Sequence, residues 1–278
     1  MKRHPALKYF RFDRPGNPHL WCSGCGIPQI WYYTIKAIEE LKLDIDKVLW
    51  VGGSGCTGRM CTYWIGDYFH TLHGRPLGFA TGVKLANPEL TVICHMGDGE
   101  VAGIGGNHLI QTARRNVDLV AIVVNNFNYG MTGGQFSPTT PRGAFTMTSQ
   151  LGHIEYPFDL CELAATCGAT YVARWTTFQS RPLIRSIKKG IQKRGFSLIE
   201  VISQCPTQYG RRNKIGNGMQ MMKWFKENSV RKERAEKMSK EELKDKFIVG
   251  EFVDIEKAEF GASLRKLIEK RRGENGKS

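Results

Sequence analysis

Residues 91–99 read Thr-Val-Ile-Cys-His-Met-Gly-Asp-Gly, and residues 119–126 read Leu-Val-Ala-Ile-Val-Val-Asn-Asn. In both stretches an apolar run leads directly into polar or glycine residues, as at the end of a buried strand. Two short motifs end these stretches, Gly97-Asp98-Gly99 and Asn125-Asn126, and 25 residues lie between them. The sequence therefore predicts two buried strands, each of which ends at a polar turn.

The same alternation of apolar runs and helical patterns extends on both sides of this stretch. Strands are predicted at residues 48–51, 91–96, 119–124, 171–173 and 198–202, and helices at residues 27–41, 75–86, 104–113, 158–167 and 181–194. Strands that alternate with helices are typical of an α/β fold, a parallel sheet with helices on both faces. The nearly continuous apolar strands fit this fold, because both faces of such a sheet are covered.

The polar turns have the chemistry of a metal and phosphate site. Asp98 and Asn126 would supply a carboxylate and a carboxamide oxygen at neighbouring strand ends, and Mg²⁺ prefers such ligands together with phosphate oxygens. Glu100 is expected to point to the other side if the turn is tight. Residues 52–59 and Cys205 also follow strands, and open α/β sheets bind ligands at this edge. The alternative is a pair of ordinary strand-ending turns, since both words are common turn sequences.

Eight cysteines are present, and the positions of four of them indicate a shared site. Cys22 and Cys25 form a CxxC word, while Cys56 and Cys205 follow strands at the same edge of the predicted sheet. Four thiolates suit a [4Fe–4S] cluster. A CxxC word also occurs in zinc knuckles and redox dithiols, and the two single cysteines could be unrelated core residues. Three others lie within apolar or helical patterns and are predicted to be buried: Cys94, Cys161 and Cys167.

Composition and charge narrow the class of protein. The chain has 278 residues, 41% of them hydrophobic, and no run of 18 apolar residues, so a cytoplasmic protein without a membrane span is expected. The net charge is +14, and residues 210–278 hold 19 Lys or Arg against 12 Asp or Glu. An acidic protein partner or a plain solvated surface fits this charge better than nucleic acid, for which no motif is present.

The strand–helix rhythm stops after residue 212. This change predicts a first domain of residues 1–212 and a basic C-terminal extension of residues 213–278. Within the extension, one short strand is predicted at residues 247–253 and a terminal helix at residues 258–272.

Further short motifs along the chain resemble those of one enzyme family. In order they are WCxGCG at 21–26, GxGCTG at 53–58, HTLHGR at 70–75, ATGxKLANP at 80–88, the Gly-Asp-Gly word, RRN at 114–116, NNxxYGMTGGQxSPTTP at 125–141 and the late Cys205-Pro206. This series resembles the thiamine-diphosphate-binding β subunit of the 2-oxoacid:ferredoxin oxidoreductases. The resemblance implies the thiamine-diphosphate-binding fold and an oxidoreductase subunit that acts on an oxo group with an iron–sulfur acceptor.

The resemblance also implies a set of ligands. Mg²⁺ would be held by Asp98, by the side chain of Asn126 and by the carbonyl oxygen of Asn128. A [4Fe–4S] cluster would be held by Cys22, Cys25, Cys56 and Cys205. Contacts with thiamine diphosphate would come from twelve residues: Ser54, Gly55, Cys56, Thr57, His73, Gly97, Asp98, Gly99, Asn126, Asn128, Gly130 and Met131. The cofactor would carry the chemistry, and the activating carboxylate would come from an α subunit.

The implied reaction is the coenzyme A-dependent oxidative decarboxylation of a 2-oxoacid, or the reverse carboxylation, with electrons passed through the cluster to ferredoxin. The MTGGQ word at residues 131–135 resembles 2-oxoglutarate-type members, whereas many relatives carry lysine within residues 132–134. Pyruvate is the alternative substrate. The competing interpretation of the cysteines and the charge is a zinc-stabilised basic binding module without catalysis.

Overall fold

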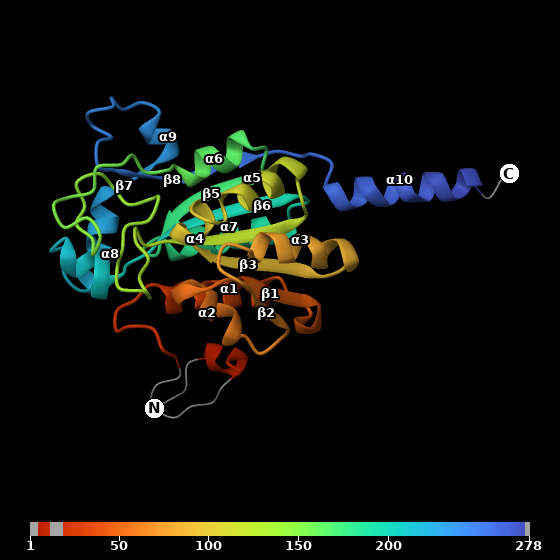
Figure 1. Ribbon diagram of the computed structural model, residues 1–278, viewed down its shortest axis with the longest axis horizontal. Helices are drawn as coiled ribbons and strands as arrows, with labels where there is room; N and C mark the ends of the chain where they lie inside the picture. Colours follow the sequence, from red (N-terminus) through yellow and green to blue (C-terminus); the bar gives the residue numbers. More distant parts are fainter. Residues whose placement is uncertain (1–4, 12–18, 276–278) are drawn as a thin grey trace.

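The protein is built on one mixed sheet, in a computed structural model that describes residues 5–11 and 19–275. Within these residues eight strands have the order β2-β1-β3-β4-β6-β5-β8-β7. Neighbouring strands are parallel except for β8, which is antiparallel to β5 (Figure 1). The strands are β1 (Val48–Gly52), β2 (Tyr68–His70), β3 (Thr91–Gly97), β4 (Leu119–Asn125), β5 (Tyr171–Thr176), β6 (Phe196–Ile202), β7 (Ser229–Arg231) and β8 (Phe247–Asp254).

Helices follow most of the strands. The α-helices are α1 (Ile27–Glu40), α2 (Gly55–Thr62), α3 (Pro76–Ala86), α4 (Asp98–Ala102), α5 (Gly106–Arg115), α6 (Leu160–Thr166), α7 (Ser180–Gln192), α8 (Gly218–Asn228), α9 (Lys232–Ala235) and α10 (Phe260–Asn275). Shorter helical turns are η1 (Pro5–Tyr9), η2 (Ile45–Lys47) and η3 (Pro206–Gly210).

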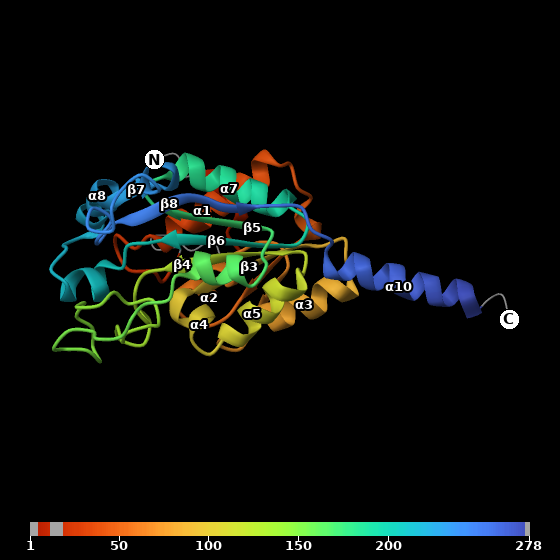
Figure 2. The same ribbon diagram turned by 90° about the horizontal axis from the view of Figure 1, so that it is seen from above.

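The helices cover both faces of the sheet. Successive residues of a strand point to opposite faces, so β4 contributes to two cores. Ile122 packs in the core that includes α1 and α7, whereas Ala121 and Val123 pack in the core that includes α3, α5 and α6. Figure 2 shows α1 and α7 on one side of the sheet and α3 and α5 on the other. This arrangement confirms the predicted α/β fold.

The predicted strands and helices are present, with ends that differ by up to three residues. Two ends differ by three residues: α10 ends at Asn275 instead of residue 272, and β5 continues beyond residue 173 to Thr176. All six residues of β5 are buried, so a buried arginine interrupts the apolar pattern. The three-residue edge strand β2 has no apolar run to indicate it.

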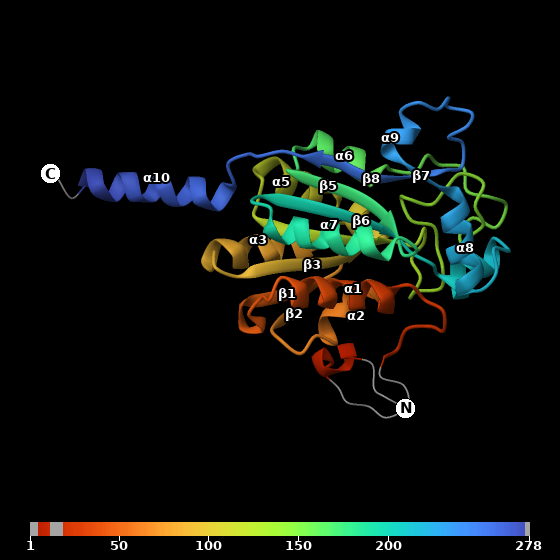
Figure 3. The same cartoon turned by 180° about the vertical axis from the view of Figure 1, so that it is seen from behind.

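The last quarter of the chain is divided between the sheet and a projecting helix. The strand predicted at residues 247–253 is confirmed as β8, which lies between β5 and β7 inside the sheet. Val249 belongs to the same core as α1 and α7. The sheet therefore continues across the boundary predicted at residue 212. After it, α10 confirms the terminal helix and extends away from the body (Figures 1 and 3).

The parallel strands bring the polar words of the sequence to one edge. β1 leads into α2, β3 into α4, β4 into the long connection to α6, and β6 into η3, all at the carboxyl ends of parallel strands. This is the edge where open α/β sheets bind ligands. None of the helices in residues 5–11 and 19–275 is both long and apolar enough to cross a membrane.

Candidate functional site

Three oxygen atoms from two strand ends converge at this edge. The side-chain oxygen of Asn126 lies 3.3 Å from Asp98 Oδ1 and 2.7 Å from the carbonyl oxygen of Asn128. Oxygens at these separations repel each other unless a cation lies among them, or unless the Asn126 amide turns so that its nitrogen donates to both. Adjacent ligands of an octahedral Mg²⁺ ion are about 2.9 Å apart. The donor set and its spacing therefore fit a hard divalent cation.

The second oxygen of Asp98 is already occupied by the protein. Ser137 and Thr139 donate their hydroxyl hydrogens to Asp98 Oδ2 across 2.5 and 2.6 Å. Asp98 is 2% exposed, and this burial raises its pKa to about 6. The two hydroxyl groups fix the carboxylate so that Oδ1 faces Asn126. A cation bound there would offset the cost of burying the negative charge.

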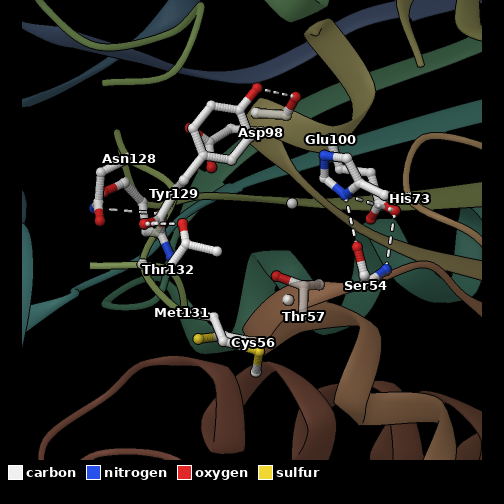
Figure 4. Close-up of a pocket in the computed structure, with 15 residues that line it drawn as sticks. Ser54, Cys56, Thr57, His73, Asp98, Glu100, Asn128, Tyr129, Met131 and Thr132 are labelled. Carbon is white, nitrogen blue, oxygen red and sulfur yellow. Dashed lines mark hydrogen bonds and ion pairs between the residues drawn. The ribbon is translucent and has the colours of Figure 1, made fainter. Parts of the chain in front are cut away.

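A cavity of about 280 Å³ opens beside these oxygens. All twelve residues for which the sequence predicts cofactor contacts line it, and they come from loops, from the end of β3 and from the first turns of α2 and α4 (Figure 4). Asp98 and Asn128 lie on one side and Ser54 and His73 on the other, with Cys56 below. Three further lining residues were not predicted: Glu100, Tyr129 and Thr132.

Glu100, which the sequence predicts to point to the other side from Asp98, joins the separate walls of this cavity. Asp98 begins the short helix α4, so Glu100 is turned from Asp98 but reaches the opposite wall of the same cavity. Its Oε1 accepts hydrogen bonds from the backbone N–H groups of Ser54 (3.1 Å) and Gly74 (3.0 Å). Burial raises the pKa of Glu100 to about 7. The loops after β1 and β2 are thereby tied to the end of β3.

Ser54 and His73 form a pair at the mouth of the cavity. Ser54 Oγ lies 2.7 Å from His73 Nδ1, a hydrogen bond that orients the imidazole ring (Figure 4). Partial burial lowers the pKa of His73, which favours the neutral ring at pH 7. A neutral imidazole that is fixed at one nitrogen can donate or accept a hydrogen bond at the other. The pair therefore suits a polar group of a bound ligand.

The four cysteines of the predicted cluster surround a second, smaller pocket of about 130 Å³. We call this the cysteine pocket, lined by Cys22, Cys25, Cys56 and Cys205. The two pockets adjoin at Cys56 and Gly130, which line both. A Cβ at Gly130 would lie 3.6 Å from Cys205 Sγ and 3.8 Å from Cys56 Sγ. The loop from Asn126 thus contributes to both pockets.

Cys25, Cys56 and Cys205 are partly buried and Cys22 is exposed, and the thiols lie close enough to influence one another. Burial raises the pKa of Cys25 to about 12 and that of Cys56 to about 11, and the negative charge of a neighbouring thiolate adds to both increases. Hydrogen bonds from the backbone of Gln208 and Tyr209 to Cys205 act in the opposite direction. Metal binding would have to displace these protons. In residues 5–11 and 19–275, no three His, Cys, Asp or Glu side chains lie close enough to hold a single metal ion.

The cysteines expected in the core are found there with one exception. Cys94 and Cys161 are fully buried, as predicted, whereas Cys167 is half-buried at the end of α6. Cys61 is also fully buried, in α2.

Comparison with known proteins defines the class to which this fold and site belong. The family described as "Thiamine pyrophosphate enzyme, C-terminal TPP binding domain" matches residues 51–201. These residues include the end of β1, all of β3 and β4, and the polar motifs that follow these strands, and so most of the cavity. The chain thus contains a thiamine-diphosphate-binding enzyme domain, as the sequence predicts.

More specific relatives match almost the whole chain. The chain is 54% identical to 2-oxoglutarate synthase subunit KorB of Methanocaldococcus jannaschii, over 98% of this chain and 100% of the relative. It is 38% identical to 2-oxoacid:ferredoxin oxidoreductase 2, subunit beta, of Aeropyrum pernix, over 74% of this chain and 64% of that relative. A solved structure, "2-oxoglutarate:ferredoxin oxidoreductase from Magnetococcus marinus with 2-oxoglutarate, coenzyme A and succinyl-CoA bound", is similar with a TM-score of 0.82 and 28% identity, over 96% of this chain and 90% of that chain.

The chain belongs to the family of β subunits of the 2-oxoacid:ferredoxin oxidoreductases. The family predicted from the ordered words is therefore confirmed, and with it the prediction of an oxidoreductase subunit.

Proposed function

We propose that this chain is the β subunit of a 2-oxoglutarate:ferredoxin oxidoreductase. With an α subunit it would convert 2-oxoglutarate and coenzyme A into succinyl-CoA and carbon dioxide, or catalyse the reverse carboxylation, and exchange electrons with ferredoxin. The high identity to relatives named as 2-oxoglutarate synthase subunits supports this substrate. Pyruvate is the second candidate, since the 2-oxoacid relatives are not restricted by name to 2-oxoglutarate.

One observation carries the proposal: the oxygen atoms of Asp98, Asn126 and Asn128 converge in a cavity that shares Cys56 and Gly130 with the adjoining cysteine pocket. A magnesium–diphosphate site and an electron-accepting site would then be neighbours. Such closeness suits a reaction in which electrons leave the substrate carbon for an iron–sulfur cluster.

The side chains of the cavity have distinct roles in this proposal. Asp98, Asn126 and the Asn128 carbonyl would hold Mg²⁺ together with oxygens of the diphosphate. Gly99 and Gly130 line the cavity in which the diphosphate would lie, while Ser54 orients His73 toward the cofactor. Bound thiamine diphosphate supplies an electron sink for decarboxylation. The protein's own part is to position the cofactor, to hold its charge and to exclude water.

The cysteine pocket is proposed to hold a [4Fe–4S] cluster. Its four sulfurs surround a space, while no three of the described metal-binding side chains lie close enough for one ion. A single zinc ion needs four ligands at about 2.3 Å from the metal, so the arrangement favours a cluster over the zinc-stabilised binding module. Iron and acid-labile sulfide would support this assignment, and stoichiometric zinc without brown colour would contradict it.

An α subunit is part of the proposal because the resemblance implies that it supplies the activating carboxylate, and because the protein already engages each carboxylate among the described residues that line the cavity. The described residues that line the cavity include two carboxylates, those of Asp98 and Glu100. Ser137 and Thr139 occupy one oxygen of Asp98, and backbone N–H groups occupy one oxygen of Glu100. The activating group is therefore expected from the partner. The expected cytoplasmic location stays a prediction.

The test is to purify the chain together with its α subunit under anaerobic conditions and to measure ferredoxin reduction. We expect rates that require both coenzyme A and 2-oxoglutarate, with pyruvate at least tenfold less effective in kcat/KM. Equal or better use of pyruvate would overturn the substrate assignment. Absence of ferredoxin reduction with every 2-oxoacid, by a complex that holds thiamine diphosphate and iron, would overturn the function.

A further inference from the structure

Phe127 has a strained backbone between two proposed magnesium ligands. Its φ is +63°, in the left-handed region that a bulky side chain rarely adopts. Asn126 and Asn128 lie on either side, so this conformation sets the direction of both oxygens. Such strain persists only where the surrounding structure over-determines it.

Local contacts hold Phe127 in this conformation from three directions. Its N–H donates to Asn125 Oδ1 (3.1 Å), and its carbonyl oxygen accepts from Thr140 Oγ1 (2.7 Å). Its ring packs against Tyr209 and Phe247, with centroids 5.1 and 5.9 Å apart. The amide of Asn125 thus serves as a clamp on the strained turn, provided that the amide itself is fixed.

Glu200 fixes the side-chain amide of Asn125 by accepting a hydrogen bond from it. Asn125 Nδ2 donates to Glu200 Oε1 across 2.7 Å, which determines which end of the amide faces Phe127. Arg174 donates through Nε to Glu200 Oε2 (2.6 Å) and through Nη2 to Asp159 (2.6 Å). Glu200 is 2% exposed and Arg174 is 8% exposed. A buried ion pair contributes little net stability, so its presence under this turn needs another reason.

We propose that Glu200, held by Arg174, is a positioning residue for the magnesium–diphosphate site. It touches neither metal nor cofactor. It locks the Asn125 amide, which holds Phe127 in the left-handed conformation and thereby aims Asn126 and Asn128 at the oxygen of Asp98. The inference rests on the proposed function, because it assumes that these oxygens bind Mg²⁺ and the cofactor.

The C-terminal strand takes part in the same clamp. Arg174 Nη1 donates to the carbonyl oxygen of Ile248 in β8 at 3.5 Å, and Phe247 of β8 packs on the ring of Phe127. Ile248 and Phe247 lie outside residues 51–201, the part of the chain that matches the thiamine pyrophosphate enzyme family. This gives the sheet portion of the C-terminal quarter a role at the site.

The test is a compensating pair of substitutions in the full chain, purified with its partner subunit. In Glu200→Gln the single side-chain oxygen can accept a hydrogen bond from Arg174 or from Asn125, but not from both as the two carboxylate oxygens do. The new NH₂ group then faces the other donor. In Asn125→Asp two carboxylates face each other. In the double variant Glu200→Gln/Asn125→Asp, the Gln oxygen accepts from Arg174 and the Gln nitrogen donates to Asp. The hydrogen-bond chain is restored with its polarity reversed.

The readout is the Mg²⁺ concentration for half-maximal thiamine diphosphate binding, measured by calorimetry. Loss of a residue that orients metal ligands typically weakens metal affinity by about 10- to 100-fold. We expect each single variant to raise the midpoint at least tenfold, and the double variant to return to within about threefold of the wild type. The matched control is Asp118→Asn, which removes a buried carboxylate that pairs with Lys84 and Arg194 at the opposite edge of the sheet.

Melting temperatures separate positioning from general stability. The control is expected to melt lower with an unchanged Mg²⁺ midpoint. An unchanged midpoint in Glu200→Gln, or a double variant no better than the single ones, would overturn the inference. If wild-type protein binds thiamine diphosphate without any dependence on a divalent cation, the proposed magnesium site itself fails, whatever the variants do.

Discussion

Gly53 leaves open the space that the carboxylate of Glu100 occupies. A Cβ at Gly53 would overlap the carboxylate oxygens, and no small shift of a flexible neighbour could relieve this, since Glu100 is 2% exposed. The same carboxylate accepts from the N–H groups of Ser54 and Gly74. One glycine therefore permits one glutamate to connect the ends of β1, β2 and β3, and this connection shapes the wall of the cavity that carries His73.

Replacement of Gly53 by alanine tests this connection. We expect Gly53→Ala to displace Glu100, to release the loop with Ser54 and His73, and to weaken thiamine diphosphate binding at least tenfold in calorimetry. Gly82→Ala is the control, because a Cβ there meets nothing within 4 Å and alanine is the better helix former. Cofactor affinity in Gly53→Ala equal to that of the control would show that the Glu100 bridge is unimportant for the site.

The cysteine pocket predicts which thiols retain iron. Alanine at Cys22, Cys25, Cys56 or Cys205 is expected to lower the iron content per chain by more than half, because each removes one of four ligands. Cys94→Ala is the control, since Cys94 is fully buried in β3 and packs in the core that includes α3, α5 and α6. Iron is measured in anaerobically purified protein together with the visible absorbance. Full iron in the Cys205 variant, or iron loss in the control, would mean that the ligand set is wrong.

A buried histidine predicts a dependence of stability on pH. His95 is fully buried against Trp50 with a ring separation of 4.3 Å, and neither of its ring nitrogens has a hydrogen-bond partner among the residues that the structure describes. Burial lowers its pKa to about 3, whereas the unfolded chain protonates near 6.5. The unfolded state therefore binds the extra proton first, and the stability present above pH 6.5 is lost as the pH falls toward 3.

Replacement of this histidine should remove that part of the acid sensitivity. Between pH 7 and pH 4.5 the loss in free energy of unfolding is expected to be smaller in His95→Phe than in wild type by about 2 kcal/mol. Urea titrations of the metal-free chain at both pH values measure it. His70→Phe is the control, because His70 is exposed at the end of β2. Equal pH dependence in His95→Phe and wild type would contradict this account of His95.

Features carried by short stretches of sequence could be predicted, and features made by distant residues could not. Asp98, Asn126, Cys56 and Cys205 stand in local motifs at strand ends, and the parallel sheet brings those ends together. Cys22 and Cys25 form a CxxC motif just before α1. The role of Glu100 depends on its contact with the loop of Ser54, 46 residues earlier in the chain. No local pattern indicates such a contact, and a tight turn was the simplest expectation.

The buried ion pair under the site shows the same limit more strongly. Arg174 interrupts the apolar run of β5. The apolar pattern therefore predicts a strand that ends at residue 173, three residues too early. Its partners Asp159 and Glu200 lie in other elements. The sequence signal for this ion pair is a charged residue within an otherwise apolar strand. Such a residue indicates that a buried charge needs a partner, but it does not show which residue the partner is.

The basic surface beside the cysteine pocket leads to a last prediction. Pro206 and Thr207 line both this pocket and an adjoining open groove that contains Arg211 and Lys214. Both cations are exposed, whereas Arg212 donates to the carbonyl oxygen of Gly133 near the cavity and faces another way. An acidic ferredoxin that approaches the proposed cluster would meet the two exposed cations first.

Charge of this kind acts mainly on the rate of encounter and is screened once the Debye length falls to about 10 Å near 0.1 M salt. The rate of ferredoxin reduction by the assembled complex is therefore expected to fall as salt rises. Arg211→Gln/Lys214→Gln should reduce the slope of that fall by at least a third and leave kcat at saturating ferredoxin unchanged. The matched control, Arg265→Gln/Lys266→Gln, removes the same charge from α10, which projects from the other end of the molecule (Figure 1). A slope that changes equally in both variants would assign the effect to total charge, and an unchanged slope would exclude the groove as the surface that guides ferredoxin.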